Sequence, residues 1–402
     1  MAKAGSALEV FQVFLKLGLT SFGGPVAHLG YFRQAIVGRL GWLDEKAYAE
    51  LVALCQFLPG PASSQVGIGI GLMRAGPPGA LAAWAGFTLP SALLLMAFAF
   101  NLTTLEKAFG TGWMHGLKLA AVAVVAQAVW SMARSLTPDR QRMSLALAVT
   151  ALLLFWQSPL AQIAALLAGA WAGLLLFRKA GAKERPCPLP LPIGRRTAWV
   201  CLLLFALLLA GLPLAAWLIP DRRLALFSAF YRSGSLIFGG GHVVLPLLES
   251  SVVAPGWISQ PDFLAGYGAA QAVPGPLLTF SAYLGAMIGS APNGVAGAAL
   301  ALAAIFLPSF LLVFAALPFW SLLRERPGVR AAMTGVNAAV VGLLLATLYH
   351  PVFTAGLRGP ADFAIAAAAL LLLEGWRWPP WLVVLLSAAA GAVLTGPQQI
   401  VQ

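Results

Sequence analysis

Two helix-breaking motifs each occur twice in this chain of 402 residues. FGGP at positions 22–25 precedes PGP at 59–61, and FGGG at 238–241 precedes PGP at 274–276. The second copy follows the first by 216 residues at the first motif (22 to 238) and by 215 at PGP (59 to 274). An offset this constant indicates an internal duplication. We therefore expect the chain to fold as two related halves.

The composition places both halves in a lipid bilayer. Hydrophobic residues make up 60% of the chain, charged residues 9%, and the mean hydropathy is +0.86, whereas soluble domains are about 45–50% apolar. Apolar runs reach about 20 residues, enough for a helix to cross a hydrocarbon core of about 30 Å, while barrel strands alternate over about 10 residues. This predicts an all-α polytopic membrane protein. The net charge of +12 lies mostly in loops and does not indicate nucleic-acid binding.

The apolar runs predict about 12–13 transmembrane segments. Copy one (1–177) and copy two (221–402) hold six each, and a linker domain at 178–220 combines a basic, proline-rich stretch with one unpaired apolar segment. Loops on the N-terminal side hold 15 Lys and Arg residues against seven opposite, which predicts a cytoplasmic N-terminus. Because of the unpaired segment, the second copy enters the membrane in the opposite direction to the first. Inverted repeats are therefore expected, as in secondary transporters.

Within each copy, two segments are interrupted and two are short. FGG interrupts 8–30 and 225–248, and PGP interrupts 47–72 and 263–289. Each copy ends in two short, nearly abutting segments that are expected to form a helical hairpin. We expect broken or re-entrant helices at the interruptions. Whether the FGG segments cross the membrane or turn back stays open.

The interruptions predict an anion site. Backbone groups freed inside a bilayer need protein or a watery cavity, and a helix that restarts there presents free N–H groups and about half a positive charge. The alternative is a proline kink that only shapes packing. The substrate-binding candidates at the breaks are Gly23, Gly24, Pro59, Gly60, Pro61, Gly239, Gly240, Pro274, Gly275 and Pro276.

A cation occupies the same place in both repeats, Lys16 in copy one and Arg232 in copy two. A charge inside a membrane costs about 2.5–3.5 kcal/mol and needs a partner, for which an anionic substrate is suitable. The alternative is that both side chains snorkel to the interface. Uncharged hydrogen-bonding candidates are Gln56, Ser63 and Gln271, and Lys118 and Asn337, which also correspond between the repeats, are secondary candidates.

Three residues could carry a coupled proton: His28, His242 and Glu249. For each of them a purely structural role is the alternative. The three cysteines show no metal-type spacing, so neither a metal site nor a cofactor is expected. The sequence also shows no phosphate-binding loop or nucleophile motif in usable context, so an enzyme is not expected and gradient-driven transport is favoured.

The run FLKLGLTSFGGP at 14–25, with QFLPGP at 56–61 and FGGGH at 238–242, closely resembles the chromate ion transporter family in its long, two-domain form. The resemblance covers nearly the whole chain. It implies a bacterial inner-membrane protein that exports chromate, confers chromate resistance and is energised by an ion gradient. The family signature falls on the glycines and prolines of the breaks. Copy two has Gly241 where copy one has Pro25, which suggests unequal halves.

These observations predict an antiporter that binds a tetrahedral dianion between two inverted repeats. Chromate is the expected substrate. A carrier of sulfate or another oxyanion is one alternative, and a membrane-embedded enzyme acting on a lipid-linked substrate is another. A channel fits less well because no ring of charge is evident. A homodimer stays open.

Overall fold

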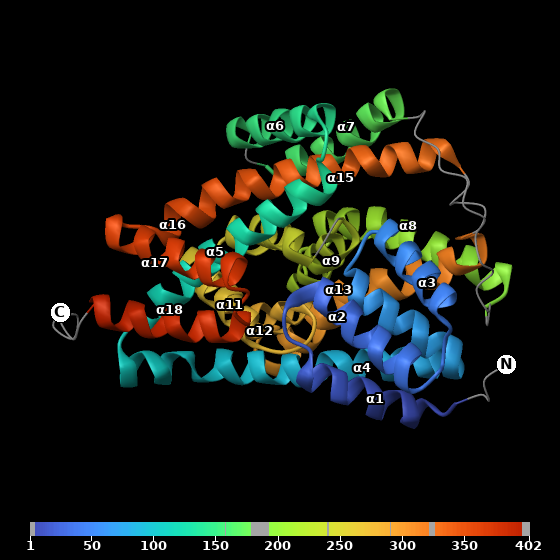
Figure 1. The fold of residues 1–402 in the computed structure, drawn as a ribbon, viewed down its shortest axis with the longest axis horizontal. Helices are drawn as coiled ribbons and strands as arrows, with labels where there is room; N and C mark the ends of the chain where they lie inside the picture. The colour runs from blue at the N-terminus through green and yellow to red at the C-terminus, as the bar shows by residue number, and fades with distance from the viewer. Residues whose placement is uncertain are drawn as a thin grey trace.

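The computed structural model of the protein describes residues 5–156, 158–177, 193–238, 241–289, 291–320 and 326–395. Every regular element in these ranges is a helix (Figure 1). Five helices are long and apolar enough to cross a membrane: Ala62–Phe109, Gly112–Leu136, Arg195–Leu218, Gly294–Phe319 and Pro327–Gly356. Shorter apolar helices accompany them. The expected all-α polytopic membrane protein is confirmed, and the basic stretch 178–192 lies outside the described residues.

The FGG motif of copy one separates two short helices. α1 (Ala7–Thr20) has 14 residues and is therefore about 21 Å long, less than the roughly 30 Å of a hydrocarbon core. The chain turns through Gly23, whose φ of 99° favours glycine, and restarts as α2 (Gly24–Phe32). This is the break that the motif predicts.

Copy two has the same arrangement. α9 (Arg222–Ser235) ends shortly before FGGG, and the chain restarts as η2 (Gly241–Val243) and α10 (Val244–Leu248). The predicted site residues Gly239 and Gly240 lie outside the described residues.

Each PGP motif is the tip of a helical hairpin. α3 (Glu45–Phe57) leads to the tip, and the first turns of α4 (Ala62–Phe109) run back beside it, so that a Cβ at Gly69 would lie 2.7 Å from the Leu51 side chain. In copy two, α11 (Gln260–Ala272) precedes the tip, and η4 (Leu277–Thr279) and α12 (Phe280–Met287) follow it. The segments 47–72 and 263–289 therefore fold back on themselves at PGP and do not cross in one pass.

After the hairpin, the two copies continue differently. In copy one, α4 kinks at Ala75 and Gly76 and then continues unbroken to Phe109. In copy two, the corresponding stretch is the separate helix α13 (Gly294–Ala316). The remaining short helical elements are η1 (Arg33–Arg39), η3 (Glu249–Val253), η5 (Leu317–Phe319), η6 (Leu348–Phe353), α16 (Thr354–Gly356) and η7 (Leu371–Gly375).

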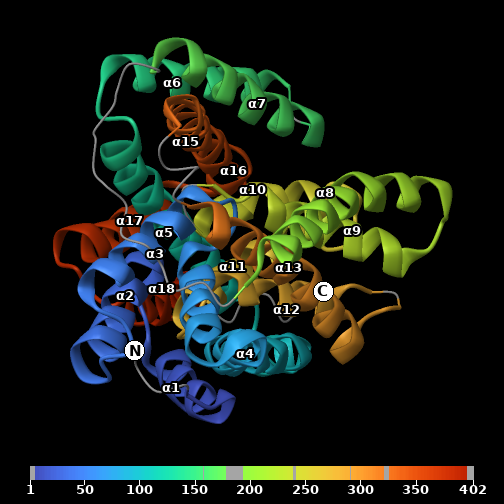
Figure 2. The ribbon, with the colours of Figure 1, turned by 90° about the vertical axis from the view of Figure 1, so that its right-hand side faces the viewer.

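The terminal helix pairs are exchanged between the copies. α6 (Arg140–Phe155) and α7 (Pro159–Leu176) of copy one pack on α15 (Pro327–Thr347) of copy two, as both ribbon views show (Figures 1 and 2). Reciprocally, α17 (Pro360–Leu370) and α18 (Pro380–Thr395) of copy two pack on α5 (Gly112–Leu136) of copy one. These pairs are the short helical hairpins expected from the sequence, but each serves the opposite half.

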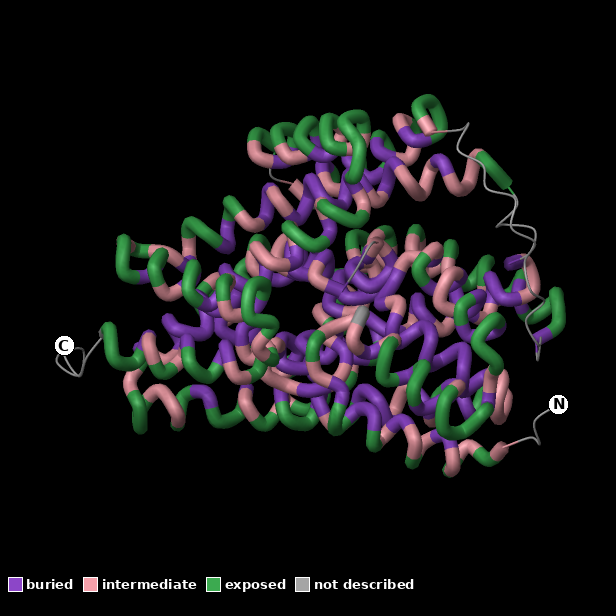
Figure 3. The backbone as a smooth tube through the Cα atoms, viewed as in Figure 1, coloured by how far each residue is buried: buried purple, intermediate pink, exposed green. Residues whose placement is uncertain are grey.

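The linker helix α8 (Arg195–Leu218) lies at the periphery of the molecule and packs against α9 and α13. Only 11% of its most apolar window is buried, whereas 72% is buried for the span that contains α13. Burial is concentrated in the middle of the molecule, and helix faces at the edges are exposed (Figure 3). Since these exposed faces carry leucine and tryptophan, they suit contact with lipid.

Candidate functional site

The breaks of one copy meet the hairpin tip of the other copy. The backbone N–H of Gly275 donates a hydrogen bond to the carbonyl oxygen of Ser21 at 2.9 Å, and that of Gly60 donates to Ile237 at 2.7 Å. Ser21 and Ile237 correspond in the repeat (21 to 237), as do Gly60 and Gly275 (60 to 275). The two bonds are therefore equivalent under the repeat: in one, copy two donates to copy one, and in the other, copy one donates to copy two. The four interruptions gather in two pairs, each built from both copies.

Glycine is required at the copy-two tip. Gly275 has a φ of 95°, in the left-handed region, and a Cβ there would lie 3.1 Å from the Phe87 carbonyl oxygen of α4. The Ser91 hydroxyl, also on α4, donates to the carbonyl oxygen of Pro274. The backbone of the tip is thus fitted closely against copy one.

A cavity of about 70 Å³ lies at this junction. Copy one contributes the start of α2 and one face of α5, and copy two contributes the tip, the end of α11 and η2. The described residues that line it are Gly23, Gly24, Pro25, Val124, Gln127, His242, Ala270, Gln271, Val273, Gly275, Leu277 and Pro380. None of these is Lys, Arg, Asp or Glu.

The cavity nevertheless presents hydrogen-bond donors. α2 begins at Gly24 without a side-chain cap, and η4, which leads directly into α12, begins at Leu277 also without one. Uncapped helix starts leave N–H groups that favour negative charge. The side-chain nitrogen of Gln271 is buried and has no hydrogen-bond partner among the residues that the structure describes. A buried donor left unpaired costs about 1–3 kcal/mol, so it indicates a ligand that accepts a hydrogen bond.

Two further polar side chains complete the lining. Nδ1 of His242 lies 2.8 Å from the hydroxyl of Tyr267. The Gln127 amide donates to the exposed carboxylate of Glu374 at 3.4 Å. Gln127 could not be predicted from the sequence, since it belongs to no motif and its repeat counterpart is Ala346. The cavity is therefore uncharged and bounded by dipoles, an environment that can hold an oxyanion.

The two matched cations lie elsewhere. Lys16 is exposed on α1, and Arg232 is half-buried on α9. Arg232 lines a cavity of about 10 Å³ together with Gln162 and Ser250. Glu249 lines a cavity of about 160 Å³ that shares those two residues, so the structure places these two candidates in adjoining cavities. It brings neither Lys16 nor Arg232 to the junction of Gly24 and Gly275.

None of the other sequence candidates in the described part of the chain is among the residues that line the cavity at this junction. His28 is buried, with Nδ1 3.5 Å from the Ser63 hydroxyl. Pro59, Gly60 and Pro61 form the copy-one tip, and Gln56 is exposed in a wide groove on α3. Lys118 is buried on α5, and Asn337 is half-buried on α15, with its side-chain oxygen unpartnered within the described ranges. Pro274 and Pro276 flank Gly275 at the copy-two tip.

The chain matches known proteins along almost its whole length. The model of the family described as chromate transporter matches residues 8–174 and again 224–392. The chromate transport protein of Pseudomonas aeruginosa is 28% identical over 97% of this chain and 93% of that protein, and that of Cupriavidus metallidurans is 27% identical over 96% and 92%. An uncharacterized transporter of Methanocaldococcus jannaschii is 26% identical over 97% and 94%. No solved structure matches the chain.

Proposed function

The chain belongs to the chromate transporter family, and from this premise we propose that it is a secondary transporter that carries chromate through the cavity between Gly24 and Gly275. The substrate is then a tetrahedral dianion. Gln271, His242, Gln127 and the uncapped starts of α2 and η4 are its proposed ligands.

The observation that carries the proposal is the unpaired Gln271 amide beside two uncapped helix starts. Hydrogen bonds to an ionised group are worth about 1.5–3 kcal/mol each, so a few such donors replace much of the hydration that a dianion loses. A lining without charged side chains also avoids a long-lived ion pair between the protein and the dianion. Binding that is not too strong lets the substrate leave, which transport requires.

An asymmetry between the halves supports alternating access. α5 packs on α11, where Gly268 lies directly against the Leu117 carbonyl. The counterpart helices α15 and α3 make no comparable contact among the described residues. The matching face of α3, which includes Ala53 and Gln56, instead lines an open groove of about 510 Å³. The face of α11 is therefore covered by α5, whereas the matching face of α3 borders an open groove.

Exchange of these two arrangements is the proposed transport cycle. In the opposite state α15 would cover α3, while α5 would withdraw from α11 and open the cavity. If the repeats are inverted in the membrane, this exchange exposes the substrate alternately to the two sides. The glycine contacts of α5 with α18, and of α15 with α7, suit movement of each exchanged group as a unit.

The finer features of the proposal follow from the sequence. We propose that the protein exports chromate from the bacterial cytoplasm across the inner membrane in antiport with protons, and that this export confers chromate resistance. The N-terminus is proposed to be cytoplasmic. Glu249, which lines a cavity, and the buried His28 are the proposed proton carriers. Sulfate is the second candidate substrate, because neutral donors in a small cavity recognise the shape and charge that sulfate shares with chromate.

Purified protein in liposomes tests the transport proposal. With a proton gradient imposed, we expect chromate to accumulate on one side of the membrane. When the gradient is collapsed, this accumulation should stop. Unlabelled sulfate in excess measures the competition between the two dianions. Correctly folded protein that moves no chromate in either direction would contradict the proposal. Protein-free liposomes and liposomes with the Gly275→Leu variant serve as controls.

A further inference from the structure

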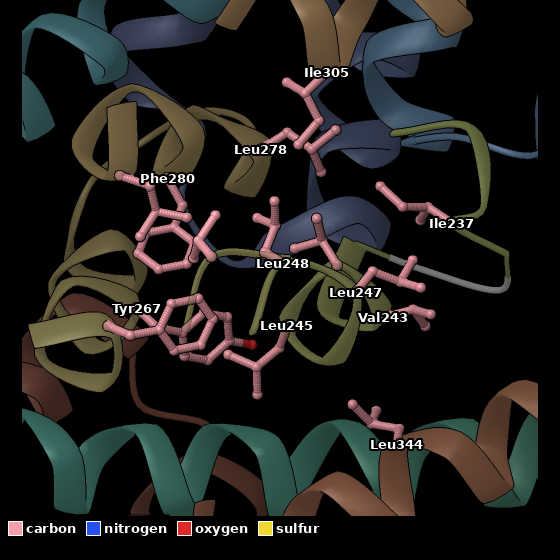
Figure 4. Close-up of a cluster of buried hydrophobic side chains, with 14 of the residues drawn as sticks. Ile237, Val243, Leu245, Leu247, Leu248, Tyr267, Leu278, Phe280, Ile305 and Leu344 are labelled. Atoms are coloured by element: carbon pink, nitrogen blue, oxygen red, sulfur yellow. The ribbon is translucent and has the colours of Figure 1, made fainter. Parts of the chain in front are cut away.

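Tyr267 is a buried tyrosine whose hydroxyl reaches the edge of the candidate site. It lies on α11, one helical turn before Gln271, and its ring packs edge-on against Phe280 with centroids 5.8 Å apart. Apolar side chains surround it, among them Leu245 and Leu248 (Figure 4). The hydroxyl lies 2.8 Å from Nδ1 of His242, and the half-buried His242 lines the cavity.

The direction of this hydrogen bond follows from the surroundings. A buried hydroxyl proton needs an acceptor. Within the described part of the chain, Nδ1 of His242 is the single hydrogen-bond partner found for the Tyr267 hydroxyl. The tyrosine therefore donates and Nδ1 accepts. A neutral imidazole that accepts at Nδ1 carries its proton on Nε2, so the other edge of the ring is a donor.

We propose that Tyr267 is a positioning residue, which holds neutral His242 with its Nε2–H available to the bound oxyanion. This inference rests on the proposed function, because it assigns a role at the same cavity. His242 then recognises the anion as a hydrogen-bond donor and does not shuttle protons. The neighbours are consistent with a neutral ring: Gly23 and the first residues of α2, Gly24 and Pro25, carry no charge. α11 presents Gln271, and the charge of Glu374 lies beyond Gln127.

The pair belongs to one copy only. The repeat counterparts of Tyr267 and His242 are Val52 (52 to 267) and Val26 (26 to 242), neither of which can donate from its side chain. Repeat symmetry alone therefore does not explain the tyrosine and histidine. The cavity of about 70 Å³ lies at the junction that contains this pair. The proposal thus gives a chemical reason why the two junctions are unequal.

Nitrogen NMR on the full-length protein in nanodiscs tests the tautomer without any transport assay. The signals of His242 are assigned by their loss in His242→Gln. We expect an unprotonated Nδ1 and a protonated Nε2 in the wild type, and a mixture of the two tautomers in Tyr267→Phe. A wild-type His242 protonated at Nδ1 would overturn the proposal, whether or not the protein transports chromate.

Chromate flux in proteoliposomes tests the role in recognition. We expect Tyr267→Phe to raise KM about 3- to 10-fold with kcat nearly unchanged, the effect of one lost or misdirected hydrogen bond. In a His242→Gln background the same change should have no further effect. Tyr283→Phe is the matched control, because its buried hydroxyl donates to the Asp262 carbonyl at 3.0 Å, away from the cavity. If the effects of Tyr267→Phe and His242→Gln on KM were additive, or if Tyr283→Phe raised KM as much as Tyr267→Phe, the positioning role of Tyr267 would be overturned. A wild type that moves no chromate contradicts the proposed function instead.

Discussion

The backbone N–H of Gly275 donates a hydrogen bond to the carbonyl oxygen of Ser21 at 2.9 Å. This bond joins the hairpin tip of copy two to the end of α1 in copy one, beside the cavity. Its repeat equivalent joins Gly60 to Ile237. The proposed anion site therefore belongs to neither copy alone, and changes in either copy should affect it.

A side chain at Gly275 should disrupt the junction. Because its φ is 95° and a Cβ would press on the Phe87 carbonyl oxygen, Gly275→Ala should displace the tip and lower chromate flux at least about tenfold. Gly256→Ala is the control, since Gly256 has a φ of 73° but open space around its Cβ position. Flux and melting temperature are measured for both. Equal flux in the two variants would contradict the claim that the tip at Gly275 must pack closely against α4.

Removal of the unpaired amide should weaken binding. Gln271→Leu deletes a donor to a charged ligand, worth about 1.5–3 kcal/mol, and should raise KM for chromate about 10- to 100-fold. Gln56→Leu changes the repeat counterpart, which is exposed in the groove on α3, and should alter KM less than about threefold. Saturation curves in proteoliposomes provide both values. The reverse order of effects would place the anion at the other junction.

The exchanged helix pairs should hold the halves together through glycine contacts. A Cβ at Gly335 on α15 would lie 2.7 Å from Cα of Gly173 on α7. Gly335→Ala should therefore destabilise the protein by about 1–3 kcal/mol and lower its melting temperature in detergent. Gly328→Ala, on the same helix, meets only the Leu174 side chain at 3.6 Å and should melt like the wild type. Indistinguishable melting of the two variants would argue against the exchange.

The proposed opposite state can be trapped by a disulfide. Val336 is the repeat counterpart of Leu117, and Ala53 is that of Gly268, so these two should meet when α15 covers α3. In a protein with its native cysteines replaced, Ala53→Cys with Val336→Cys should cross-link under oxidation and stop flux. Reduction should restore it. Absence of the cross-link under all gradients, with flux intact, would contradict the exchange of arrangements.

The repeat and the helix-breaking residues predicted much of the fold. Apolar runs fixed the all-α class, and FGG and PGP predicted where helices end, because glycine and proline act on the local backbone. Exchange of the terminal helix pairs was not predictable, since it depends on which glycine faces which, as at Gly335 and Gly173.

The lining of the candidate cavity was predicted only in part. Gly24, Gln271 and His242 line the cavity, but Lys16 does not. Lys16 and Arg232 occupy equivalent positions in the two repeats, yet Lys16 is exposed and Arg232 is half-buried, so repeat symmetry does not predict their surroundings. Gln127 contacts Glu374 and Tyr267 contacts His242, and no local motif encodes contacts between residues this far apart in sequence.

The most direct test of the account is the position of chromium in a structure of the full chain with chromate bound. Its anomalous scattering identifies the ion without ambiguity. We expect one peak in the cavity between Gly24, Gln271 and Leu277, within hydrogen-bonding reach of the Gln271 amide for the oxyanion. A peak beside Gln56 or in the cavity of Glu249, with the first cavity empty, would contradict the central claim.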